Sequence, residues 1–194
     1  YQSMRNLTGK VCQRLVRERN RVPETGRKLA DRFVALQEHV LNRFRDVLDP
    51  DLGGMRIRCH GDFHLGQLLH TGKDFVVIDF EGEPGRAIGE RRLKRSPLRD
   101  VAGMIRSFDF AAESVRLGLA STRGRSQGVI RAEDQPTLAV WASAWFNRVS
   151  REYVMAYVDA MAASGLLPAA DGGRRTLLEL FVLEKALREI DAEL

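Results

Sequence analysis

Apolar residues recur at helical spacing along the first fifty residues and predict two amphipathic helices. The first helix is expected from about Ser3 to Arg19, with an apolar face formed by Met4, Leu7, Val11 and Leu15. The second is expected to end near Asp49-Pro50, with an apolar face formed by Leu29, Phe33, Leu36, Val40, Phe44 and Val47. Side chains three and four positions apart share one face of a helix, so each set predicts contact with a core.

Two short β-strands are expected next. Apolar residues alternate at Met55, Ile57 and Cys59, and a continuous apolar run follows from Phe75 to Ile78. Alternation and short apolar runs bounded by turn residues are typical of strands. These segments predict a small β-hairpin in a chain that is otherwise helical.

The second half of the chain predicts three further helices. Ser96-Pro97 has the pattern of a helix cap followed by a first-turn proline, which predicts a helix containing Val101, Ile105 and Phe108. A long helix is expected from Pro136 to about Ala163, and a last one from Arg174 to the end of the chain. The predicted fold class is therefore mainly α with a small β-hairpin (α+β).

Two stretches between these helices predict loops, because glycine and charged residues replace the apolar period over residues 82–96 and 121–135. On the long helix, Trp141 and Trp145 could stack on a sugar ring. Aromatic residues four positions apart on a helix more often belong to a core, and that is the role expected of both tryptophans.

The composition predicts one globular domain over residues 1–194, with 44% hydrophobic and 29% charged residues. The net charge is +5, and one group of basic residues lies between Arg14 and Arg32. These residues alternate with acids and lack aromatic partners, which argues against nucleic-acid binding. Cys12 and Cys59 lack the spacing of metal ligands, and no run of about 18 apolar residues is present to span a bilayer. A cytoplasmic protein that binds neither nucleic acid nor membrane is expected.

The most informative motif places two acids and an amide at the predicted strand ends. It reads His60-Gly61-Asp62-Phe63-His64-Leu65-Gly66-Gln67, followed by Phe75-Val76-Val77-Ile78-Asp79-Phe80-Glu81. Phosphoryl transfer needs a carboxylate that orients and deprotonates the attacking hydroxyl, and oxygen ligands that hold Mg²⁺ against nucleotide phosphates. Asp62 fits the first role, and Gln67 and Asp79 fit the second. Glu81 is a further candidate for a second metal ion or for the acceptor.

This motif resembles the catalytic loop of protein kinases and, in its His-Gly-Asp opening, the aminoglycoside phosphotransferases. A longer string is similar to the maltokinase family, particularly the form fused to trehalose synthase: Ile78-Asp79-Phe80-Glu81-Gly82-Glu83-Pro84-Gly85-Arg86, then Glu90-Arg91-Arg92 and Ser96-Pro97-Leu98-Arg99-Asp100-Val101-Ala102-Gly103-Met104. The resemblance implies the C-terminal lobe of a protein-kinase-like, aminoglycoside phosphotransferase-like fold. It also implies ATP and Mg²⁺ as cofactors and phosphorylation of maltose to maltose 1-phosphate.

The resemblance assigns further roles. His60 and Asp100 would support the catalytic loop, and Lys185 and Glu189 would lie near the sugar. No glycine-rich phosphate loop or strand-borne lysine is found, so the nucleotide-binding N-terminal lobe is expected to be missing and this piece to be inactive alone. Maltokinases carry two tyrosines in the last helix where this chain has Arg188 and Ala192, which leaves the acceptor open.

Three alternatives stay open. Glucosamine kinases resemble maltokinases and depend on an acid in the last helix, so glucosamine or another small sugar is the alternative acceptor. A metallohydrolase could use His60, Asp62 and His64, although such a site needs more imidazoles and carboxylates than His39 and His70 offer. The chain could also be a catalytically inactive scaffold lobe inside a fused polypeptide.

Overall fold

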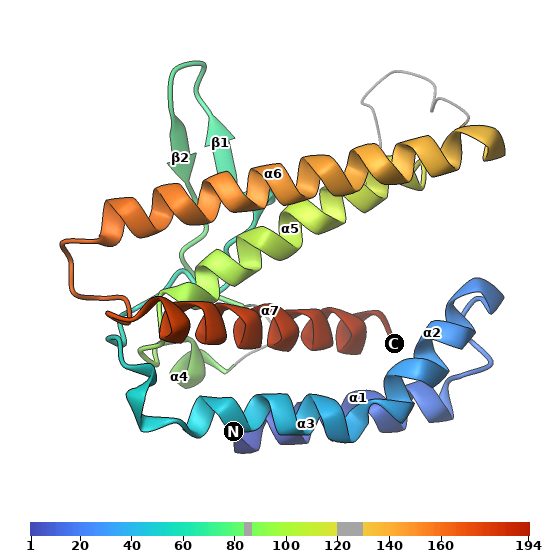
Figure 1. Cartoon of the computed structure of the whole chain (residues 1–194), viewed down its shortest axis with the longest axis horizontal. Helices are drawn as coiled ribbons and strands as arrows, with labels where there is room; N and C mark the ends of the chain where they lie inside the picture. The colour runs from blue at the N-terminus through green and yellow to red at the C-terminus, as the bar shows by residue number, and fades with distance from the viewer. Residues whose placement is uncertain (84–86, 120–129) are drawn as a thin grey trace. The chain divides into compact units, whose positions relative to one another are not determined.

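The structure is a computed structural model that describes residues 1–83, 87–119 and 130–194. It is mainly helical with one two-stranded antiparallel sheet, so the predicted fold class is confirmed (Figure 1). These residues form two compact units, residues 1–54 with 168–194 and residues 55–167. Most of the loop predicted over residues 121–135, and Pro84, Gly85 and Arg86 of the motif string, lie outside the described residues. In the described ranges, no helix has both the length and the apolar character needed to cross a membrane.

The first unit packs three helices around α1 (Gln2–Arg17): α2 (Glu24–Ala35), α3 (Gln37–Arg45) and α7 (Asp171–Glu193). Two 3₁₀ turns, Asp46–Leu48 and Pro50–Leu52, follow α3. The core comes from the predicted apolar faces, because Val11, Phe44, Leu180 and Leu187 are fully buried. Burial of such side chains contributes about 1.5–3 kcal/mol each, which is what holds the amphipathic helices together.

The single helix predicted up to Asp49 is wrong, because the chain breaks it into α2 and α3 at Leu36. That residue has φ −91° and ψ 6°, and it is both the C-cap of α2 and the N-cap of α3. The break changes the direction of the chain, so Val40 and Phe44 of α3 are buried while Leu29 and Leu36 stay exposed. An apolar period that continues through a bend cannot reveal the bend.

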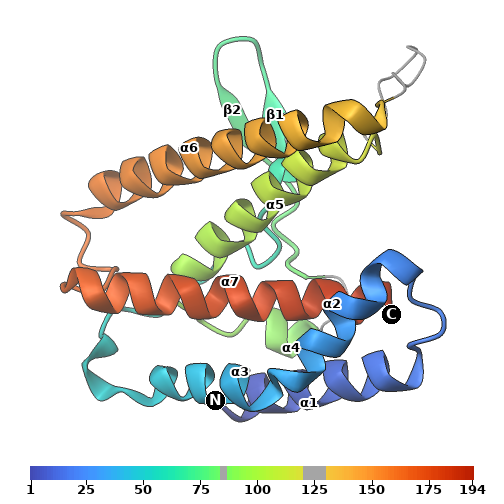
Figure 2. The same cartoon turned by 45° about the vertical axis from the view of Figure 1, so that its right-hand side comes forward.

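The second unit is built on two long helices that lie side by side, α5 (Leu98–Arg116) and α6 (Gln135–Met161) (Figure 2). Phe108 of α5 meets Trp145 and Tyr153 of α6 edge to face, with ring centroids 6.2 and 5.6 Å apart. Trp141 is 70% exposed, so the core role predicted for it is wrong, and Trp145 contacts Phe108 while remaining 45% exposed. The short helix α4 (Ile88–Arg91) lies in the segment predicted as a loop, and a 3₁₀ turn, Ala132–Asp134, precedes α6.

The hairpin pairs β1 (Leu68–His70) with β2 (Phe75–Val77), in the register Leu68 to Val77 and His70 to Phe75. The strand predicted over Met55 to Cys59 is wrong, because Ile57 makes only an isolated antiparallel bridge with Arg95. A four-residue connection makes β1 the nearest partner of β2, and pairing across a short turn has a low entropy cost. The true first strand therefore follows the His60–Gln67 segment instead of leading into it.

Candidate active site

The loop that contains Asp62 is held by one face of α5. Asp100, in the first turn, accepts the backbone N–H of His60 at 2.7 Å and that of Gly61 at 2.9 Å. One turn further, the carbonyl of Phe63 lies where a side chain at Gly103 would be, because a Cβ there would come within 2.6 Å of that oxygen. After another turn, Ser107 Oγ accepts the N–H of Leu65 at 3.1 Å.

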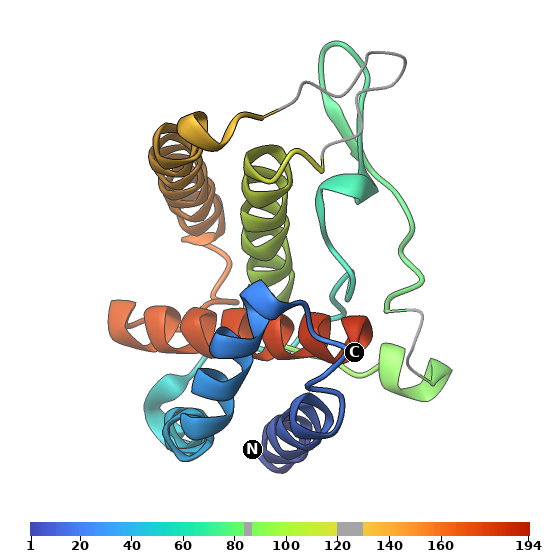
Figure 3. The same ribbon diagram turned by 90° about the vertical axis from the view of Figure 1, so that its right-hand side faces the viewer.

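These three helix residues are three and four positions apart, so they form one stripe along α5. In Figure 3 the segment that leads into β1 runs beside this helix. Backbone groups that cannot pair within a sheet or helix need other partners, and α5 supplies them here. The helix α5 therefore anchors one side of the loop.

His60 is buried beneath the loop, and both of its ring nitrogens face backbone groups. Nε2 lies 2.8 Å from the carbonyl oxygen of Ile78, and Nδ1 accepts the N–H of Asp62 at 3.4 Å. The rings of Phe63 and Phe80 pack against it, with centroids 5.4 and 5.1 Å away. Neither nitrogen is left to ligate an ion. Among the described residues no group of three histidine, cysteine or acidic side chains is arranged to hold a metal, so nothing supports the metallohydrolase alternative.

The hairpin brings Gln67 and Asp79 together from twelve residues apart. The N–H of Ile78 donates to the carbonyl of Gln67 at 3.0 Å, which continues the ladder one step beyond the paired strands. Gln67 Nε2 then donates to Asp79 Oδ2 at 3.0 Å. Asp79 has φ 62°, the left-handed region that few residues other than glycine adopt. Such a conformation costs of order 1–3 kcal/mol and is concentrated at functional sites.

The Gln67–Asp79 pair fits a magnesium ion. Mg²⁺ takes oxygen ligands and usually keeps several waters, so it binds through one or two protein groups together with substrate phosphates. Asp79 offers an exposed carboxylate, and the buried side chain of Gln67 lies beside it with the amide nitrogen on Asp79 Oδ2, so that the amide oxygen is the candidate ligand after rotation of the amide. Glu81 is exposed two residues beyond Asp79.

His64 lies between Asp62 and the Gln67–Asp79 pair and is close to both. The Asp62 side chain is 21% exposed, and its Oδ2 is 3.9 Å from His64 Nε2. The same His64 nitrogen is 3.4 Å from Gln67 Nε2. The structure therefore brings Asp62, Gln67 and Asp79 into one constellation: a partly accessible carboxylate next to a pair of metal-ligand candidates.

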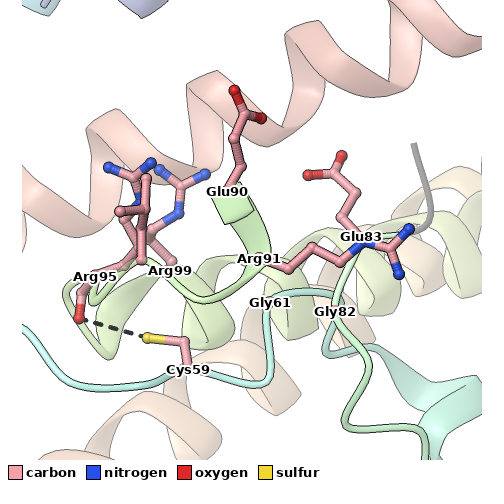
Figure 4. Close-up of a pocket in the computed structure, with 9 residues that line it drawn as sticks. Cys59, Gly61, Gly82, Glu83, Glu90, Arg91, Arg95 and Arg99 are labelled. Carbon is pink, nitrogen blue, oxygen red and sulfur yellow. Dashed lines mark hydrogen bonds between the residues drawn. The ribbon is translucent and has the colours of Figure 1, made fainter. Parts of the chain in front are cut away.

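A pocket lies at Gly61 and Gly82 (Figure 4). Three arginines and two glutamates line it together with Cys59 and Leu93: Arg91, Arg95, Arg99, Glu83 and Glu90. The Cys59 thiol donates toward the carbonyls of Ser96 and Arg95 at 3.4 and 3.5 Å. Burial, and secondly the negative charge of Asp100, raises the pKa of Cys59 to about 11. A thiol of this kind stays protonated at neutral pH and is a poor nucleophile.

The two acceptor contacts predicted from the resemblance, Lys185 and Glu189, lie on α7 in the first unit, and their roles stay predictions. The sequence interpretation missed the role of Arg188 in this helix. Its guanidinium pairs with the buried Glu184 at 2.7 Å. The residue that departs from the maltokinase pattern thus compensates a buried charge, which is costly to leave unpaired.

The sequence interpretation also missed Gly103, Ser107 and Gly66 as parts of the site. From the sequence, Gly103 and Ser107 could be recognised only as residues on the same face of the predicted helix as Asp100. A Cβ on Gly66 would come within 2.8 Å of the His64 ring, so this glycine leaves space for that ring. A hydrophobic pattern carries no signal for such close approaches.

The helical fold, the α5-anchored loop and the hairpin that follows it can be compared with those of known proteins. Residues 5–82 match the sequence profile of the phosphotransferase enzyme family. The chain is 31% identical over 123 residues to a glucosamine kinase of Streptacidiphilus jiangxiensis, which covers 62% of this chain and 25% of that protein. It is 34% identical over 143 residues to a glucosamine kinase of Mycolicibacterium smegmatis (strain ATCC 700084 / mc(2)155), covering 72% of this chain and 31% of that protein.

Solved structures show the same similarity. A glucosamine kinase in complex with glucosamine, ADP and inorganic phosphate superposes with a TM-score of 0.70 at 24% identity, over 97% of this chain and 40% of that one. A second crystal form gives a TM-score of 0.71 at 25% identity, over 97% and 39%. The chain therefore has the fold of part of a glucosamine kinase, and it spans about a quarter to two fifths of the length of these relatives.

Proposed function

We propose that this chain carries the catalytic loop of an ATP-dependent sugar kinase whose acceptor is glucosamine or a closely related amino sugar. The observation that carries the proposal is the constellation of Asp62 with the Gln67–Asp79 pair, fixed by α5 on one side and by the hairpin on the other. A base for the hydroxyl and a neighbouring site for the metal are the two parts that phosphoryl transfer requires.

Asp62 is the proposed base. It accepts the proton of a sugar hydroxyl as that oxygen bonds to the γ-phosphorus of ATP and the bond from the γ-phosphorus to the bridging oxygen of ADP breaks. Gln67 and Asp79 are the proposed ligands of Mg²⁺, and Glu81 is a candidate for a second ion or for the acceptor. When bound, Mg²⁺ neutralises phosphate charge. His60 and Asp100 keep the loop in place.

The comparisons support glucosamine over maltose as the acceptor, because the two curated relatives and the two solved structures named above are glucosamine kinases. The long motif string after Asp79 was the reason to expect maltose. Both sugars enter the test for that reason.

We also propose that this chain is the C-terminal lobe and that a nucleotide-binding lobe elsewhere in the full-length protein completes the ATP site. The share of each relative that the chain spans supports this. Calorimetry should show weak or no Mg-ATP binding to residues 1–194 alone and clear binding to the full-length protein. Tight Mg-ATP binding by residues 1–194 alone would contradict the two-lobe proposal.

The functional test uses the full-length protein with Mg-ATP and, in parallel, glucosamine, maltose and glucose. Glucosamine should give the largest kcat/KM. Asp62→Asn should lower kcat by roughly 10²- to 10⁴-fold with little change in stability, since the base acts on the acceptor. Asp79→Asn should also weaken binding of Mg-ATP. Asp109→Asn, which changes a partly exposed pair with Arg106 on α5, is the matched control. Small and equal effects of all three substitutions would show that the acids are structural.

A further inference from the structure

We propose that His64 is a positioning residue that turns the amide of Gln67 so that its oxygen faces the metal site. This inference deepens the proposed function and rests on it. It starts from three contacts of one imidazole: with the backbone of Gly66, with the Gln67 side chain and with Asp62.

The first contact fixes where the ring carries its proton. The backbone N–H of Gly66 donates to His64 Nδ1 at 3.1 Å. A neutral imidazole that accepts at one nitrogen carries its hydrogen on the other, so Nε2 is the donor. The ring fits in this position because Gly66 has no side chain: a Cβ there would lie 2.8 Å from His64 Cε1 and 3.0 Å from Nδ1.

The second contact is a mismatch. His64 Nε2 lies 3.4 Å from Gln67 Nε2, and an amide nitrogen only donates, so two N–H groups face each other. That amide orientation is stabilised by the bond from Gln67 Nε2 to Asp79 Oδ2 at 3.0 Å. His64 and Asp79 therefore favour opposite orientations of the Gln67 amide.

A half-turn of the amide removes the mismatch with His64 and creates another one with Asp79. The oxygen would then accept from His64 Nε2 and lie beside the Asp79 carboxylate, where two oxygens repel each other unless a cation is present. His64 thus lowers the free-energy difference between the two orientations of the Gln67 amide. It favours the orientation in which the amide oxygen and the Asp79 carboxylate both face a metal ion. Groups that orient metal ligands in this way typically change metal affinity by about 10- to 100-fold.

Two substitutions separate the two nitrogens of the ring. In His64→Asn the amide oxygen can take the place of Nδ1 and keep the contact with Gly66, but no donor reaches Gln67. In His64→Gln the amide nitrogen can take the place of Nε2 and keep that donor. Gly66→Ala displaces the ring without changing it. His39→Asn, on the exposed surface of α3, is the control.

The assay measures Mn²⁺ binding to the full-length protein without nucleotide, using electron paramagnetic resonance to quantify free Mn²⁺. His64→Asn and Gly66→Ala are expected to weaken binding about tenfold, while His64→Gln stays within about threefold of wild type. In nitrogen-15 NMR spectra, His64 should carry its proton on Nε2, and the Gln67 amide resonances should shift on addition of Mg²⁺. The NMR measurement needs no variant, so a variant that fails to fold cannot obscure the answer.

A proton on Nδ1 of His64, or Mn²⁺ affinity unchanged in a folded His64→Asn protein, would overturn the inference. Metal affinity unchanged by Gln67→Leu would also overturn it, because the amide would then not be a ligand. If metal binding follows the expected order but no sugar is phosphorylated, the positioning role stands and the proposed sugar kinase activity fails.

Discussion

Replacing Asp100 by asparagine is expected to loosen the loop that contains Asp62 while leaving the shape of the side chain almost unchanged. The carboxylate accepts two backbone N–H groups, one on each oxygen, at 2.7 and 2.9 Å. Asparagine keeps one oxygen and puts an NH₂ group where the other oxygen was. One hydrogen bond is lost, and the second N–H faces another donor.

The size of the effect follows from these two bonds. A hydrogen bond to a charged group contributes about 1.5–3 kcal/mol, and a backbone donor left unsatisfied costs about 1–3 kcal/mol. Some of the second cost is relieved by water, because Asp100 is not fully buried. We therefore expect a loss of about 2 kcal/mol in the free energy of unfolding, which is roughly a 30-fold change in the unfolding equilibrium constant.

Urea unfolding of the 194-residue chain, followed by tryptophan fluorescence, measures this loss in the right part of the molecule. Both tryptophans, Trp141 and Trp145, lie on α6 in the same unit as the loop. Asp109→Asn is the control on the same helix, and its partly exposed ion pair with Arg106 should contribute about 1 kcal/mol. A loss for Asp100→Asn no larger than that of the control would refute the idea that α5 anchors the loop through this carboxylate.

Two further predictions concern the same unit. Gly103→Ala should lower the free energy of unfolding by about 1–3 kcal/mol, because its Cβ would lie 2.6 Å from the Phe63 carbonyl oxygen. Gly9→Ala on α1 has open space around the new Cβ, so it should be neutral or stabilising. Urea unfolding monitored by circular dichroism compares the two variants, and equal effects would contradict the close approach at Gly103. Since the thiolate is the nucleophile and the pKa of Cys59 is about 11, alkylation at pH 8 should be roughly 100-fold slower in the folded than in the unfolded chain and should accelerate as the pH rises toward 11. Peptide mass spectrometry after iodoacetamide treatment resolves Cys59 from Cys12, and a fast folded-state reaction at pH 8 would contradict the burial of this thiol.

Much of the helical fold could be predicted from the sequence, because periodicity reports the face that a helix buries. The bounds expected for α1 and α7 agree with the structure within about three residues, and Leu177, Leu180 and Leu187 are buried as predicted. The break at Leu36 left no trace in the pattern, since apolar residues continue on both sides of it. The strand expected at Ile57 failed for the opposite reason: alternation is present, but Ile57 forms an isolated bridge with Arg95 and not a ladder.

The candidate site shows a similar division. The motif pointed to Asp62, Gln67 and Asp79, which the structure brings together, because their chemistry depends on residue type and spacing. Gly103 and Ser107 act through where α5 places them relative to a loop some forty residues away. Gly66 acts through a missing Cβ next to one ring. Packing of this kind becomes visible only once the chain is folded.

The anchoring of the loop by α5 has a consequence for how the protein folds. The hydrogen bonds from His60, Gly61 and Leu65 to α5 span 40, 39 and 42 residues of chain. Such contacts require closure of a long loop, whereas a helix and a tight hairpin form from local contacts. The loop that contains Asp62 should therefore acquire its shape late in folding, after α5 and the hairpin. Helical content alone would then be a poor measure of how much of a refolding sample has an assembled site.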